Sequence, residues 1–226
     1  MTDNNDVKST GFWQKYQLYF LLLAAIILRQ IPIVSLPLNW LESYFHEISH
    51  GIAALMTGGQ IISIQLFANG AGLCTTQGGL SFIISFFGYA GATLWGWLVF
   101  TIANSHQRTA QIFSAVMLCL LVLSMLFWVR DLLTIIIVSS LALMFFITIK
   151  LRRLYYLQLL VKFFGLSILL NSLLSPTYLF DGRSLGDGAA LAEMTLVPEF
   201  IWVLIWCVFA IIAVYQLMRA NKKYSS

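Results

Sequence analysis

The chain has 226 residues, of which 60% are hydrophobic and only 10% are charged, and its mean hydropathy is +0.86. This balance excludes an ordinary water-soluble domain, and it predicts a membrane protein in contact with the lipid bilayer. The net charge of +4 is small and the basic residues lie mostly at the ends of apolar segments, so we expect no nucleic-acid partner.

The first 16 residues carry charged side chains but no apolar run followed by a small-residue cleavage site, so we expect a soluble N-terminal tail rather than a removable signal peptide. A hydrocarbon core of about 30 Å needs roughly 20 apolar residues per crossing. Seven apolar segments of about this length follow, near residues 17–37, 40–56, 80–104, 110–128, 132–149, 155–175 and 198–218. We therefore predict an all-α polytopic membrane protein with about six to seven transmembrane helices, built as one membrane domain over 17–218 with a basic C-terminal tail over 219–226.

Basic residues gather on the side of the membrane where the C-terminus would lie if every segment crosses. The positive-inside rule then favours a cytoplasmic C-terminus. We expect a multi-pass protein of the cytoplasmic membrane of a bacterium.

The stretch FHEISHGIAALMTGG, residues 45–59, places two histidines one helical turn apart. His46 and His50 lie on one face of a helix and can offer two imidazole nitrogens to one metal ion, with Glu47 beside them. The H-E-x-x-H spacing is typical of zinc hydrolases, in which the glutamate accepts a proton from water. Histidines that only make hydrogen bonds in a core are the alternative. Ionisable groups inside a membrane segment are costly unless they are paired or ligated, and Glu42 lies one turn earlier, so metal binding is favoured.

The segment 60–79 follows the helix stop Thr57-Gly58-Gly59 and has no charged residue. Its alternation of apolar and polar residues around an Asn69-Gly70 turn predicts a short membrane-associated β-hairpin. Further along the chain, small residues at positions 88, 92 and 96 form a stripe suited to close packing of helices.

Acidic residues are rare in the middle of the chain and are concentrated between residues 181 and 199. Just before and within this part of the chain, Pro176 and several glycines interrupt the helical pattern. Such a break at membrane depth is tolerated mainly where it lines a site. Asp181 or Asp187 could therefore supply the third metal ligand, although either could instead cap the helix that begins near Gly188. The three cysteines are scattered through apolar surroundings and are expected to be packing residues rather than a disulfide framework.

The stretches HEISHGIAALMTGG, GYAGATLWG and NSLLSPTYLFDGRSL together resemble the site-2 protease family of intramembrane zinc metallopeptidases, over about residues 40–206. GDGAALAEMTLVP is similar to the compact M50B-like subgroup, in which an aspartate stands at position 187. The resemblance implies a Zn²⁺ cofactor and the following roles: His46 and His50 as ligands, Glu47 as general base, Asn171 in substrate binding, and Asp181 as third ligand with Asp187 as the alternative.

The function expected on these grounds is hydrolysis of peptide bonds in membrane-protein or peptide substrates. The alternative is a non-proteolytic metal-binding membrane protein or a metal-dependent transporter, since interrupted spans with buried acids also occur in transporters. The role of Glu47 distinguishes the two functions. A protease needs this carboxylate for chemistry more than for holding metal, whereas a transporter would need it, if at all, as a ligand or proton relay.

Overall fold

The computed structural model describes residues 4–181 and 185–223, without the side chains of residues 4–10, 14, 180–181 and 221–223. Its elements in chain order are α1 (Asn4–Arg29), α2 (Pro32–Met56), β1 (Gln60–Leu66), β2 (Gly72–Gln77), α3 (Ser81–Ser105), α4 (Gln107–Phe127), α5 (Leu132–Lys150), α6 (Leu154–Leu174), the 3₁₀ helix η1 (Ser175–Asp181), α7 (Asp187–Thr195) and α8 (Glu199–Lys223). The predicted all-α polytopic membrane class with one small hairpin is confirmed.

Five helices in the described chain are long and apolar enough to cross a membrane, namely α3, α4, α5, α6 with its 3₁₀ extension, and α8. The helices α1 and α2 pass the same test only as a pair, and their axes are bent by 110° at the break between them. If this pair is taken as one broken span, the count is six. The bend falls where Ile31 is extended and Pro32 opens α2, because a proline disfavours helical geometry in the residue before it. The two spans expected over 17–37 and 40–56 thus become one bent pair, and α1 extends back to Asn4, into the segment expected as a tail.

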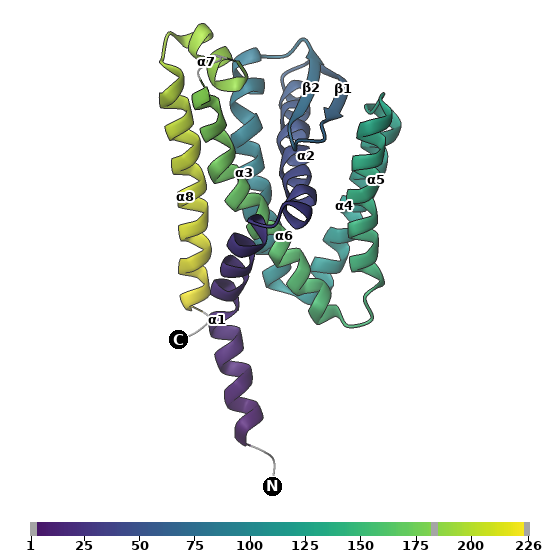
Figure 1. Ribbon diagram of the computed structural model, residues 1–226, viewed down its shortest axis with the longest axis vertical. Helices are drawn as coiled ribbons and strands as arrows, with labels where there is room; N and C mark the ends of the chain where they lie inside the picture. The colour runs from purple at the N-terminus through teal and green to yellow at the C-terminus, as the bar shows by residue number, and fades with distance from the viewer. Residues whose placement is uncertain (1–3, 182–184, 224–226) are drawn as a thin grey trace.

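The helices form a bundle in which α2 and α3 lie between two groups (Figure 1). The α4 and α5 pair lies on one side and α1 and α8 lie on the other, whereas α6 runs obliquely across the bundle from the α4–α5 side to the α8 side. The hairpin and α7 are both found at the end of the bundle opposite the chain termini. Segments from the first third and the last fifth of the chain therefore meet at that end.

The hairpin is an antiparallel pair, and the backbones of its two strands differ in their partners outside the hairpin. On the outer edge of β1, the Ile64 amide donates to the Trp128 carbonyl (3.0 Å) and the Leu66 amide donates to the Thr134 hydroxyl (2.9 Å). Gly70 adopts a φ of 89° in the turn, which glycine tolerates without strain. The turn connecting α4 and α5 thus binds β1, while the outer edge of β2 has no backbone partner among the described residues.

Hydrogen bonds between buried side chains join helices that are distant in sequence. Such bonds contribute about 0.6–2 kcal/mol each in a membrane, where van der Waals packing supplies most of the association between helices. They link α2 to α4, α3 to α6 and α6 to α1 through the pairs Tyr44–Ser124 (2.7 Å), Thr93–Ser172 (3.2 Å) and Lys162–Gln17 (2.8 Å).

The closest approach of α3 and α6 depends on Gly96, a member of the predicted small-residue stripe. A Cβ atom built on Gly96 would lie 2.8 Å from the backbone nitrogen of Leu169 and 3.0 Å from the carbonyl oxygen of Gly165. Both distances are to backbone atoms, which cannot rotate away. The helices could accommodate a side chain at this position only by separating.

We therefore expect Gly96→Val to lower the thermal transition of the purified protein, by an amount corresponding to about 1–3 kcal/mol of overpacking. Gly11→Val is the control, because a Cβ atom at Gly11 meets nothing within 4 Å. A transition of Gly96→Val equal to that of Gly11→Val would contradict close packing of α3 on α6.

Candidate metal centre

Three potential ligand atoms converge between α2 and α7. The Oδ2 atom of Asp187 lies 3.2 Å from His46 Nε2 and 3.3 Å from His50 Nε2, and the two Nε2 atoms are 3.0 Å apart. A tetrahedral zinc ion with ligand bonds of about 2.0–2.1 Å places its ligand atoms about 3.3 Å from one another. The two nitrogens and one oxygen are therefore spaced so that they could hold a single metal ion of this size.

Local helix geometry places the histidines, whereas packing of the bundle places the aspartate. His46 and His50 are one turn apart on α2, so their rings project from the same face. Asp187 is the first residue of α7, and α7 is held by Leu191, which is fully buried against Ala90 of α3 and Trp206 of α8. Asp187 is thus the first residue of α7 and not its N-cap, which is Gly186 and has no side-chain capping hydrogen bond, and its carboxylate contacts both imidazoles.

The first turns of α3 orient the imidazole rings. The Nδ1 atom of His50 lies 2.7 Å from the carbonyl oxygen of Ile84, so the Nδ1 hydrogen is donated there and Nε2 is free to bind metal. The ring of Tyr89 packs edge-on against His46, with their centroids 4.4 Å apart. Contacts with α3 therefore fix the orientation of both imidazole rings.

Gly88 makes room for the two rings. A Cβ atom at this position would lie 2.5 Å from His50 Nε2 and 2.7 Å from His46 Cε1. Of the small-residue stripe that the sequence presented as structural, Gly96 serves helix packing and Gly88 borders the metal centre.

The electrostatics of the cluster favour an ionised aspartate. Burial opposes ionisation of Asp187, but when the imidazoles are protonated, the charge of His50 and hydrogen bonds from both rings outweigh burial and hold the pKa of this carboxyl well below its usual range. A carboxylate that stays ionised is the form that binds a metal ion.

Glu47 lies between the histidines in sequence and is 4% exposed. Its carboxylate accepts a hydrogen bond from the backbone amide of Cys74 on β2. A Cβ atom at Gly72, the first residue of β2, would lie 2.5 Å from Glu47 Oε1. The hairpin therefore covers the glutamate with a strand that has no side chain at the point of contact.

The remaining predicted residues lie in different settings. The side chain of Asp181, the preferred third ligand, lies outside the described part of the chain. Asn171 is buried on α6, and its amide nitrogen donates to the Leu38 carbonyl (3.3 Å) and to Asn39 Oδ1 (3.1 Å). Sequence reasoning assigned no role to Tyr89, although this residue lies in the quoted stretch GYAGATLWG, and it missed the Ile84 carbonyl, because a backbone group leaves no sequence signal.

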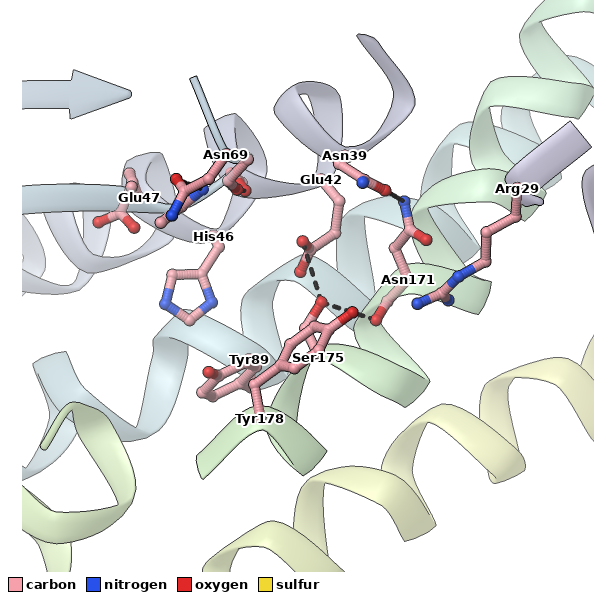
Figure 2. A pocket seen from close by; sticks show the side chains of 14 residues that line it. Arg29, Asn39, Glu42, His46, Glu47, Asn69, Tyr89, Asn171, Ser175 and Tyr178 are labelled. Atoms are coloured by element: carbon pink, nitrogen blue, oxygen red, sulfur yellow. Dashed lines mark hydrogen bonds between the residues drawn. The ribbon is translucent and has the colours of Figure 1, made fainter. Parts of the chain in front are cut away.

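A cavity of about 570 Å³ opens beside the cluster and is bordered by His46 and Glu47. From these residues it extends past Glu42 and the carboxamides of Asn39 and Asn171. Figure 2 shows these side chains in this order, with Arg29 beyond them. The wall of the cavity on this side is thus polar, and its far end is cationic.

Two helix histidines and a distant aspartate, set beside a buried glutamate in a polytopic bundle, are the arrangement of a membrane metallopeptidase. The profile of the Peptidase M50B-like family matches residues 18–217, and the chain belongs to this family. The resemblance to the site-2 protease group is thereby confirmed. No curated protein and no solved structure gave a significant match.

We expect Gly88→Ala to weaken zinc binding by about tenfold or more, since groups that support metal ligands contribute effects of this size and the added methyl would displace both rings. The measurement is zinc affinity by competition with a chelator. Gly11→Ala, where the added methyl meets no atom, should retain the wild-type affinity. Equal affinities of the two variants would show that the rings need no space at Gly88.

Proposed function

We propose that the chain is an intramembrane zinc metalloprotease that hydrolyses peptide bonds of membrane-protein substrates. The observation that carries the proposal is the convergence of His46 Nε2, His50 Nε2 and Asp187 Oδ2 within a bundle of apolar helices, next to Glu47. When bound, zinc would supply a Lewis acid that activates water and polarises the substrate carbonyl.

Glu47 is proposed as the general base. Its carboxylate borders the cavity in which a substrate amide would lie, and it is held by the Cys74 amide. It would accept the proton of the attacking water and deliver it to the nitrogen of the departing amine. Burial of Glu47 keeps the proton within the site.

Asp187 is proposed as the third ligand in place of Asp181, because the Asp187 carboxylate lies against both imidazoles. A ligand from α7 would make the centre depend on correct packing of the whole bundle, since α7 and α2 are far apart in the chain.

The unpaired edge of β2 is proposed to hold the substrate by strand addition. A substrate helix hides its amides in its own hydrogen bonds, so it must unwind before cleavage. An extended segment could then pair with β2, whose residue Cys74 already contacts the proposed base. The α4–α5 turn occupies the other edge of the hairpin, so only β2 offers this surface.

Glu47→Gln should retain zinc and lose cleavage by about 100-fold or more, because an amide of nearly the same volume cannot accept the proton. Zinc content and cleavage of a membrane-peptide substrate in detergent are measured together. Glu193→Gln, which changes an exposed acid on α7, is the control. Undiminished turnover in Glu47→Gln would exclude the base role, and metal transport without cleavage by the wild type would favour the transporter.

Asp187→Ala should lose most of the bound zinc, whereas Asp181→Ala should retain it. Metal analysis of the two purified variants, with thermal transitions to verify folding, makes the comparison. Zinc loss in Asp181→Ala and retention in Asp187→Ala would restore Asp181 as the ligand.

A further inference from the structure

Glu42 is a buried carboxylate inside the cavity that the proposed mechanism does not use. It is 5% exposed, and its Oε1 atom has no hydrogen-bond partner among the described residues. Glu42 lies one helical turn before His46, so it projects from the same face of α2, about 6 Å along the helix axis. Figure 2 shows its carboxylate directed into the cavity toward Ser175.

The hydroxyl of Ser175 only partly satisfies Glu42. Its Oγ lies 3.2 Å from Glu42 Oε2 but 2.8 Å from the Asn171 carbonyl oxygen. A hydroxyl has one hydrogen to donate, and the shorter distance favours the carbonyl. A buried carboxylate with so few donors is costly in a membrane protein, and such residues commonly mark binding sites.

The cation at the other end of the cavity interacts with Glu42 through its charge but does not contact it. Arg29 lines the same cavity from the end of α1, but no ion pair joins the two side chains in the described part of the chain. The Nη1 atom of Arg29 is itself buried without a hydrogen-bond partner. Asn39 and Asn171, linked to each other by a hydrogen bond of 3.1 Å, lie between the two charges (Figure 2).

We infer that this cavity is a charge-selective substrate subsite, in which Glu42 binds an ammonium or guanidinium group of the substrate and Arg29 binds an anionic group further from the cleaved bond. The inference rests on the proposed function, because it names the substrate features that a protease with this centre selects. Glu42 is then a specificity-determining residue. The cationic group could be a lysine or arginine side chain or a free α-amino group.

The geometry also sets the position of the basic group. An extended peptide advances about 3.3 Å per residue, and Glu42 lies about 6 Å from the level of His46 along α2. The basic group should therefore stand about two residues from the cleaved bond. The acidic group should stand further away on the same side, because Arg29 lies beyond the two asparagines.

Peptide binding to the zinc-loaded Glu47→Gln protein tests the inference without requiring hydrolysis. The probes are N-acetylated, C-amidated apolar peptides in detergent, with one lysine moved through each position and with glutamine and glutamate analogues. Lysine at one position should lower Kd about tenfold or more relative to glutamine, as expected for a hydrogen bond to a charged group. Adding Glu42→Gln should bring the ratio of the two Kd values to about one, whereas adding Glu193→Gln should leave it unchanged.

Two further arms identify the groups involved. Peptides without the acetyl group test the α-amine, which is the ligand if the free amine, rather than lysine, carries the preference. Peptides with the favoured lysine and a glutamate at successive positions beyond it test Arg29, and Arg29→Gln should remove the added affinity.

Equal Kd values for the lysine, glutamine and glutamate peptides, with and without the acetyl group, would overturn the inference, and this result needs no variant at position 42. A preference that survives Glu42→Gln would also overturn it. Failure of the proposed function would be distinguishable, because wild-type protein would then cleave none of the peptides while the Glu42-dependent preference persisted in binding.

Discussion

The contact of the Asp187 carboxylate with the two imidazoles of α2 is the interaction around which the bundle is organised. Inside an apolar bundle these groups have little water to solvate them, so they must be paired or ligated. Each neighbouring element contributes to meeting that requirement. The first turns of α3 supply the Ile84 carbonyl and the space at Gly88, and α8 holds α7 in place through Trp206.

The hairpin and the cavity offer different contacts beside the centre. The hairpin closes over Glu47, with β1 fixed to the α4–α5 turn and the outer edge of β2 without a backbone partner among the described residues. Glu47 and residues 69–72 of the hairpin line the cavity that also borders His46, and the bend between α1 and α2 brings Arg29 to this cavity. The outer edge of β2 offers backbone hydrogen bonds, which do not depend on the side chains of a bound segment. The cavity offers charged side chains, which could discriminate between substrates. The proposed peptidase would use both kinds of contact to admit unwound segments and to reject most of them.

The interhelical glycines show how close packing and metal chemistry share one sequence feature. Gly96 lets α3 approach the backbone of α6, whereas Gly88, two turns earlier on the same helix, leaves room for the imidazoles. The stripe of small residues was visible in the sequence, but its two uses were not. Which atom lies opposite each glycine depends on how the helices are rotated and shifted against each other.

The sequence by itself determined the features that depend on neighbouring residues. Long apolar runs predicted the polytopic helical class, the His46–His50 spacing predicted two nitrogens on one helix face, and the uncharged alternation around Asn69 predicted the hairpin. Only the tertiary structure decided that the Asp187 carboxylate lies against the two histidines, that α1 and α2 form one bent pair, and that Glu42 and Arg29 face one cavity without an ion pair between them in the described part of the chain. The physical reason is that periodicity fixes which side of a helix a residue occupies, whereas contacts between distant helices are fixed by the packing of the whole bundle.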